Sequence, residues 1–290
     1  MNLSIAHLGP PGTYTEQASL LYTSWLSNNT CVDAILCPYP SIAQSLQAVA
    51  KNQAQLAIVP AENSIEGSVT MTMDAMWQLD TLQIQMALVM PIAHTLISCT
   101  QSLENISSVY SHPQGLAQCQ GWLEHFLPNV QLIATNSTTE ALQRLEEDLS
   151  AAAISSQRAA ELYKLPIIAK GINDYPENCT RFWVVSQGTT PPPYELVPEK
   201  NSRTSLAFSL PANAPGALVK AMQIFANLGI NLSRIESRPT KRSLGEYLFF
   251  IDLEADAREP LMQSALVELS TYTEVLKIFG SYSILPVVSC

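Results

Sequence analysis

Short apolar runs alternate with amphipathic segments along the first two thirds of the chain, and this alternation constrains the fold more than any other feature. Residues 3–8 and 56–59 are apolar runs of strand length, the second predicted to stop at Pro60. Residues 13–26 and 41–51 have the apolar spacing of helices. Such alternation predicts an α/β sheet with mostly parallel strands, whose ligands bind beyond the carboxyl ends of the strands.

A change of composition near residue 188 predicts two domains joined by a linker. Residues 188–203 include Thr-Thr-Pro-Pro-Pro-Tyr and show no periodicity, which is typical of a linker. The order of apolar and amphipathic segments after it is βαββαβ, the order of a ferredoxin-like domain. We therefore expect a first domain over 1–187, the linker, and a second domain over 204–290.

Charge and composition exclude several classes of protein. The formal net charge of −10 disfavours binding to nucleic acid or to an anionic membrane surface. The N-terminus lacks the basic and apolar regions of a signal peptide, and the longest apolar stretch, residues 86–93, is too short to span a bilayer. We therefore expect a cytoplasmic protein with no nucleic-acid or membrane partner.

Signatures of metal and cofactor sites are absent from the sequence. The six cysteines form no C-x-x-C pair, and the four histidines show no ligand spacing. The sequence contains no glycine-rich dinucleotide loop, Walker loop or zincin motif. We therefore expect no metal and no cofactor.

Four polar clusters are the candidate functional sites: residues 9–16, 60–68 and 111–119, which follow predicted strands, and residues 177–182, which lead into one. Taken singly, the first and third are better explained by a capped helix start. The second crowds five hydrogen-bonding side chains into seven residues, so a turn and a site explain it equally well. In the fourth, Arg181 at the start of an apolar strand either points to solvent or holds an anion with its planar fork.

Together, the clusters resemble the motifs of the prephenate dehydratase family in order and spacing. The matching segments are G-x-x-G-T-Y-T-E-Q-A from Gly9, P-x-E-N-S-I-E-G-S-V from Pro60, S-H-P-Q from Ser111 and T-R-F from Thr180. Ala61, Gly115 and Lys164 depart from the residues common in the family. Residues 215–219 and 235–239 resemble the G-A-L-V and E-S-R-P motifs of an ACT regulatory domain. Because the sequence shows no helical chorismate mutase segment before residue 1, we expect the form without that fusion.

The resemblance implies a two-lobed catalytic domain, like that of periplasmic binding proteins, with the site between the lobes. It implies decarboxylative dehydration of prephenate to phenylpyruvate, a step of L-phenylalanine biosynthesis that uses no cofactor. Thr180 would donate to the departing hydroxyl, Arg181 would hold the carboxylate of the pyruvyl side chain or the pocket wall, and Phe182 would pack against the substrate ring. The other catalytic candidates are Asn63 and Gln114, and the substrate-binding candidates are Thr13, Ser64, Glu62, Ser111, His112 and Phe182.

The resemblance also implies allosteric regulation by L-phenylalanine, bound between ACT domains of two subunits in a homo-oligomer, either a dimer or a tetramer. The candidate effector-binding residues are Asn213, Pro215, Gly216, Ala217, Leu218, Val219, Asn231, Glu236, Ser237 and Arg238. Two alternatives remain open: an arogenate dehydratase, which performs the same chemistry on the aminated substrate, and an amino-acid sensor without catalytic activity.

Overall fold

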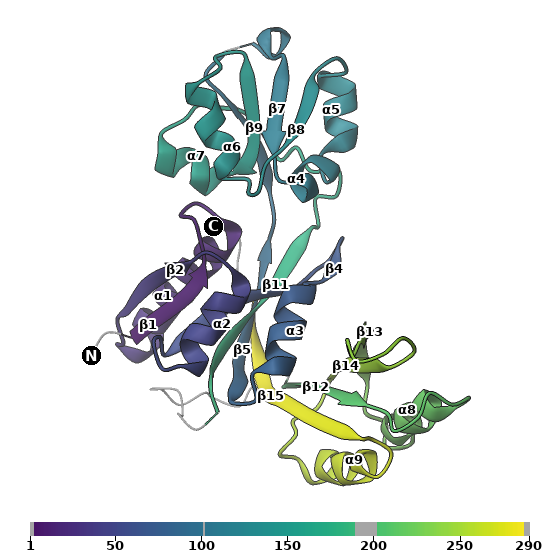
Figure 1. Ribbon diagram of the computed structural model, residues 1–290. Helices are drawn as coiled ribbons and strands as arrows, with labels where there is room; N and C mark the ends of the chain where they lie inside the picture. The colour runs from purple at the N-terminus through teal and green to yellow at the C-terminus, as the bar shows by residue number, and fades with distance from the viewer. Residues whose placement is uncertain (1–2, 101, 189–201, 287–290) are drawn as a thin grey trace.

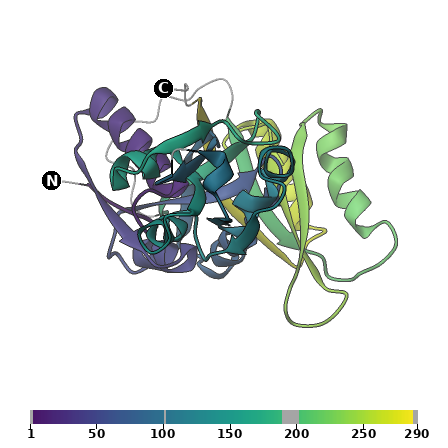
Figure 2. The same ribbon diagram turned by 90° about the horizontal axis from the view of Figure 1, so that it is seen from above.

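The computed structural model describes residues 3–100, 102–188 and 202–286, which form two lobes and a third, C-terminal α/β unit (Figure 1). Seen from above, the C-terminal unit lies beside the first lobe (Figure 2). None of the described helices is both long and apolar enough to cross a membrane.

The first lobe is a mixed sheet covered by helices. Its strands, in spatial order, are β2 (Ala34–Tyr39), β1 (Leu3–Leu8), β3 (Leu56–Asn63), β11 (Cys179–Gln187) and β5 (Leu82–Pro91), and its helices are α1 (Tyr14–Thr30), α2 (Ile42–Ala50) and α3 (Thr70–Gln78). Strand β1 is parallel to both neighbours, but β11 is antiparallel to β3 and β5. The expectation of mostly parallel strands is therefore wrong at the centre of this sheet, because β11 arrives from the second lobe in the opposite direction.

Pro60 does not end its strand, contrary to the sequence-based expectation. Strand β3 continues to Asn63, and a short strand, β4 (Gly67–Ser68), pairs back onto it. Pro60 lies opposite Phe182, where the ladder shifts register between Arg181 and Phe182. A proline has no N–H to donate, so strands accommodate it at such an irregularity. The continuation places Asn63 directly opposite the start of β11.

The second lobe is a smaller mixed sheet. Its strands, in spatial order, are β10 (Ile167–Lys170), β6 (His94–Ser98), β9 (Ala151–Ser156), β7 (Ser108–Ser111) and β8 (Gln131–Ala134), and its helices are α4 (Pro113–Ala117), α5 (Gln120–Phe126), α6 (Glu140–Gln143) and α7 (Gln157–Tyr163). Two 3-10 turns, Leu103–Asn105 and Arg144–Glu146, complete it. The sequence predicts a single helix over residues 113–126, with Pro113 in its first turn, but the structure breaks it between α4 and α5.

Two chain segments connect the lobes, and they are hydrogen-bonded to each other. One joins β5 to β6 through residues 92–93, and the other joins β10 to β11 through residues 171–178. The backbone N–H of Ile92 donates to Asn178 O at 2.8 Å, and the side-chain amide of Asn173 donates to Ile92 O at 2.9 Å. Side chains on these segments therefore lie where both lobes meet.

The C-terminal unit has the expected βαββαβ order. It consists of β12 (Arg203–Ser209), α8 (Ala217–Asn227), β13 (Leu232–Pro239), β14 (Tyr247–Leu253), α9 (Pro260–Ser270) and β15 (Val275–Pro286). Strand β15 runs past this unit, and Ser283–Pro286 pair in parallel with Met86–Val89 of β5. One sheet thus extends from the C-terminal unit into the first lobe. Most of the predicted linker, residues 189–201, lies outside the described residues.

Candidate functional site

Thr180 and Asn63 face each other across neighbouring strands. The Asn63 side-chain amide donates to Thr180 Oγ1 at 2.9 Å and to Asn178 Oδ1 at 2.8 Å. Its own Oδ1 accepts from the backbone N–H groups of Ile65 and Glu66, which fixes the orientation of the amide. Because Thr180 Oγ1 accepts this bond, the hydroxyl hydrogen of Thr180 is free to donate elsewhere.

Hydrogen bonds continue from Asn178 into the second lobe. The Asn178 amide donates to Gln118 Oε1 at 3.0 Å, and His94 Nε2 lies 3.0 Å from the same oxygen. His94 Nδ1 is 2.9 Å from the hydroxyl of Tyr14, which belongs to α1 of the first lobe. We call Thr180, Asn63, Asn178, Gln118, His94 and Tyr14 the interlobe network. Asn178, His94 and Gln118 are all buried, at 1%, 3% and 7% exposure.

Burial keeps both ring-bearing members of the interlobe network uncharged at neutral pH. Desolvation lowers the pKa of His94, with the hydrogen bond to Gln118 acting in the opposite direction. Desolvation also raises the pKa of Tyr14, so its hydroxyl keeps its proton. A chain of neutral donors and acceptors therefore reaches Thr180 from the interior.

Arg181 and Glu62 lie on the opposite face of the same two strands, contrary to their expected contact with a substrate. The Arg181 guanidinium pairs with Asp252 of the C-terminal unit at 2.5 Å and with Glu62 at 2.7 Å, and only 8% of its side chain is exposed. Successive side chains of a strand point to opposite faces, so Thr180 and Arg181 cannot face one ligand from a regular strand. The structure thus assigns this arginine to the contact between domains.

Gln118, rather than Gln114, takes part in the interlobe network. Gln114 is exposed in the first turn of α4, whereas Gln118 follows the end of that helix and is buried. Among the described residues, the Gln118 side-chain nitrogen has no hydrogen-bond acceptor, so its two hydrogens are available to a ligand. Gln118 is thus a candidate that the sequence did not indicate, and the role of Gln114 stays a prediction.

Several other predicted substrate-binding residues have structural partners. The Thr13 hydroxyl caps α1, accepting from the N–H of Glu16 and donating to Leu8 O. Ser111 donates to Ile154 O at 2.8 Å and is fully buried, and His112 caps α4 by accepting from the N–H of Gln114. Ser64 accepts from the backbone N–H of Cys179 and remains exposed.

Phe182 belongs to the core of the first lobe. It is 1% exposed and packs in an apolar cluster that includes Ile5, Met90 and the partly buried Tyr14. The prediction that it packs against a substrate ring is not supported by this position.

The candidate effector-binding residues lie on the C-terminal unit, and most of them are exposed. Gly216 precedes α8 at φ 80°, a left-handed conformation that favours glycine, and Val219 is 65% exposed on that helix. Asn213 lines a hollow of about 390 Å³, and Asn231 lines another of about 540 Å³. Arg238 instead forms an ion pair with both carboxylate oxygens of Asp74 on α3, so it connects the C-terminal unit to the first lobe. The remaining candidates are Pro215, Ala217, Leu218, Glu236 and Ser237, on the same turn, on helix α8 or on strand β13.

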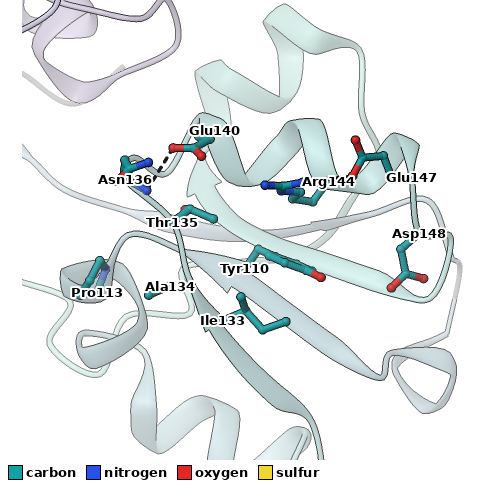
Figure 3. Close-up of a pocket in the computed structure, with 10 residues that line it drawn as sticks. All are labelled: Tyr110, Pro113, Ile133, Ala134, Thr135, Asn136, Glu140, Arg144, Glu147 and Asp148. Atoms are coloured by element: carbon teal, nitrogen blue, oxygen red, sulfur yellow. Dashed lines mark hydrogen bonds and ion pairs between the residues drawn. The ribbon is translucent and has the colours of Figure 1, made fainter.

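A hollow of about 400 Å³ on the second lobe contains none of the predicted site residues (Figure 3). Its charged side chains bind near neighbours in the sequence: Glu140 accepts from the N–H of Asn136, and Arg144 forms an ion pair with Glu147. In the part of the chain that the structure describes, no three His, Cys, Asp or Glu side chains gather as metal ligands would. Among the described residues, the interlobe network instead offers donors for a ligand, the Thr180 hydroxyl and the Gln118 amide, beside buried partners that fix their orientation.

Comparisons with known proteins identify the family. A model of the prephenate dehydratase family matches residues 5–190, and a model of the ACT domain matches residues 204–270. The chain belongs to the prephenate dehydratase family. The members of this family are carbon–oxygen lyases, and the ACT assignment agrees with the βαββαβ order of the C-terminal unit. The prephenate dehydratase resemblance, the two-lobed fold and the ACT domain are therefore confirmed.

Individual relatives cover nearly the whole chain. The bifunctional chorismate mutase/prephenate dehydratase of Aquifex aeolicus is 39% identical over 97% of this chain and 73% of that protein. The crystal structure of the Arthrobacter aurescens prephenate dehydratase in complex with L-Phe has a TM-score of 0.84 and 32% identity, covering 99% and 93% of the two chains. GqqA, described as a novel type of quorum-quenching acylase, has a TM-score of 0.79 and 28% identity, covering 97% and 98%.

Proposed function

We propose that this protein converts prephenate to phenylpyruvate, with loss of carbon dioxide and water, at the interlobe network. The observation that carries this proposal is the hydrogen bond from the fixed Asn63 amide to Thr180 Oγ1, which frees the threonine hydrogen for a departing hydroxyl. Family membership supplies the substrate class, and this geometry supplies the residue for the step that needs a proton.

In the proposed reaction, the carbon–carbon bond to the ring carboxylate breaks, and its electron pair enters the ring. The carbon–oxygen bond to the ring hydroxyl breaks, and that hydroxyl leaves as water after taking a proton. Thr180 donates a hydrogen bond, or the proton itself, to the leaving oxygen. A threonine hydroxyl is a weak acid, so precise placement of the hydrogen matters more than its acidity.

Neutral donors suit a decarboxylation better than a cation would. Negative charge leaves the scissile carboxylate in the transition state, so a tight ion pair to that group would stabilise the ground state more than the transition state. Arg181 is already committed to Asp252 and Glu62. We propose that the free amide hydrogens of Gln118 orient the substrate, with Asn63 and Thr180 beside them.

We further propose that L-phenylalanine regulates this activity through the ACT domain. The Arthrobacter relative, crystallised in complex with L-Phe, supports this proposal. The exposed turn at Gly216 and the neighbouring strand β13 are the proposed effector contacts, completed by the ACT domain of a second subunit. A homo-oligomer, dimer or tetramer, located in the cytoplasm, is part of the same proposal.

Three alternatives define the experiment. Arogenate differs from prephenate by an amino group in place of the keto group, and a sensor would bind without turnover. An acylase, as in the GqqA description, needs an activated nucleophile. Among the described residues, Thr180 Oγ1 accepts from an amide and has no base as partner, which favours the lyase.

The test supplies purified protein with prephenate, arogenate or an acylated amine and measures phenylpyruvate, phenylalanine or released amine. We expect phenylpyruvate from prephenate, with kcat reduced roughly 100-fold or more in Thr180→Val and largely kept in Thr180→Ser. Added L-phenylalanine should lower the rate. If only arogenate is turned over, the protein is an arogenate dehydratase. If prephenate binds but is not turned over, the sensor without catalytic activity is the better explanation.

A further inference from the structure

Each hydrogen bond of the interlobe network has a donor direction, and the direction is fixed at one end by the backbone. The N–H groups of Ile65 and Glu66 can only donate, so Asn63 Oδ1 faces them and its nitrogen faces Thr180 and Asn178. Asn178 must then present Oδ1 to Asn63 and its nitrogen to Gln118. The orientation of one amide thus dictates that of the next.

The same logic extends to the histidine. Gln118 Oε1 already accepts from Asn178, and as an oxygen it can only accept from His94 Nε2 as well. His94 is therefore protonated on Nε2, and its Nδ1 presents a lone pair to the Tyr14 hydroxyl, which also donates to the backbone oxygen of Ala93 at 2.9 Å. With Gln118 Oε1 occupied twice, its nitrogen must point away from the network.

We infer that Asn178, His94 and Tyr14 are positioning residues for the reaction: their hydrogen bonds fix which atoms of Gln118 face the substrate as donors, beside the Thr180 hydroxyl that Asn63 orients. This inference rests on the proposed function. Tyr14 comes from helix α1, Asn178 from the segment between the lobes, and His94 from the first residue of β6. The chain of hydrogen bonds therefore links both lobes at the point where they join.

An alternative is that these residues only hold the lobes together, and kinetics separates the two roles. Asn178→Asp keeps the shape of the side chain, but its carboxylate cannot donate to Gln118 Oε1. We expect kcat to fall roughly 10–100-fold with a much smaller change in KM, because the donors are displaced rather than removed. Asn105→Asp, the same change at an exposed position, should leave kcat unchanged.

Rescue at His94 provides a second kinetic test. His94→Leu removes the donor to Gln118, whereas His94→Gln keeps an N–H near the position of Nε2. We expect the leucine variant to lose kcat as Asn178→Asp does, and the glutamine variant to recover a large part of it. Tyr14→Phe should lower kcat, and Tyr163→Phe, on the exposed side of α7, should not.

The direction of the bonds is measured without turnover by nitrogen NMR of protein labelled in its histidines. We expect His94 to be neutral at pH 7, with hydrogen on Nε2 and none on Nδ1. Hydrogen on Nδ1, or unchanged kcat in both Asn178→Asp and His94→Leu, would overturn the inference. If the unmodified protein made no phenylpyruvate, the proposed function would fail, and the NMR result would still decide the direction of the network.

Discussion

Asp252 is a fully buried carboxylate held by two arginines. Arg234 approaches it at 2.9 Å and Arg181 at 2.5 Å, and Ser205 donates to it at 2.6 Å. Burial opposes ionisation, but the two guanidinium groups outweigh it and lower the pKa of Asp252 to about 2. The carboxylate therefore contributes stability to the contact between the dehydratase and ACT domains.

Asp252→Asn should destabilise the protein by about 3–5 kcal/mol at pH 7, because it leaves two buried arginines without their shared anion. Urea unfolding measures this cost. A lowered pKa stabilises the fold above the unfolded value of about 4, so the difference from the unmodified protein should shrink as pH falls from about 4 toward 2. Glu147→Gln breaks an exposed pair with Arg144 and should cost less than about 1 kcal/mol. Equal costs for the two variants would contradict this account.

Gly115 allows Ser111 its present orientation. A Cβ at residue 115 would lie 2.6 Å from Ser111 Oγ, so Gly115→Ala should turn the serine away from Ile154 O. Loss of that buried hydrogen bond costs about 1–3 kcal/mol and outweighs the gain of about 1 kcal/mol in helix propensity. Thermal unfolding of Gly115→Ala alone and in a Ser111→Ala background forms a double-mutant cycle. The alanine at 115 should become neutral or stabilising in that background, and an unchanged penalty there would disprove the clash.

Strand β11 shows how much of the site was predictable from the sequence. The tripeptide Thr180–Phe182 identifies the family, and the alternation of a strand already separates Thr180 from Arg181. The sequence does not reveal which residues contact each face of β11. The partner of Arg181, Asp252, is 71 residues away and belongs to the other domain. Gln118 was missed because a continuous helix was expected where α4 and α5 are separate.

Strand β3 gives the complementary lesson. Its N-terminal half was predicted from apolar composition, but its extension past Pro60 depends on pairing with a strand more than a hundred residues later. Strand β2 was not predicted, and it contains Pro38 at the edge of the sheet, where proline is tolerated. Non-local pairing decided both cases.

Phe182→Leu tests whether the third residue of the tripeptide serves the core or the substrate. The side chain is buried in the first lobe, so we expect the free energy of unfolding to fall by about 1–2 kcal/mol with KM for prephenate unchanged. Denaturant titration and steady-state kinetics give the two quantities. Phe126→Leu, at a 49% exposed position, is the matched control for stability. A raised KM with unchanged stability would instead support the prediction that Phe182 packs against the substrate ring.

At the scale of the whole molecule, one sheet crosses from the C-terminal unit into the first lobe, so we expect the stabilities of the two parts to be coupled. Ser283–Pro286 pair with β5, and Ile284 packs partly buried against the core that contains Trp183. The four tryptophans, residues 25, 77, 122 and 183, all precede the ACT domain. Tryptophan fluorescence therefore reports unfolding of the dehydratase domain, together with loss of its contact with the C-terminal unit, where the Trp77 ring packs edge-on against Phe250.

Ile284→Asp should lower the urea midpoint of tryptophan fluorescence, although the residue belongs to strand β15 of the C-terminal unit. The buried charge and the disturbed ladder both act on β5, at a cost of about 2 kcal/mol or more. Val267→Asp, on the exposed face of α9 at 67% exposure, should leave the midpoint nearly unchanged. Equal midpoints for all three proteins would show that the two domains unfold independently.

The shared ladder between β5 and β15 has a consequence for recombination between related genes. A crossover in the linker gives a chimera whose residues 82–91 come from one parent and whose residues 283–286 come from the other. Such a chimera must join two strand edges that were never selected together. Functional hybrids should therefore be most frequent when both segments come from the same parent, even though nearly two hundred residues of sequence lie between them.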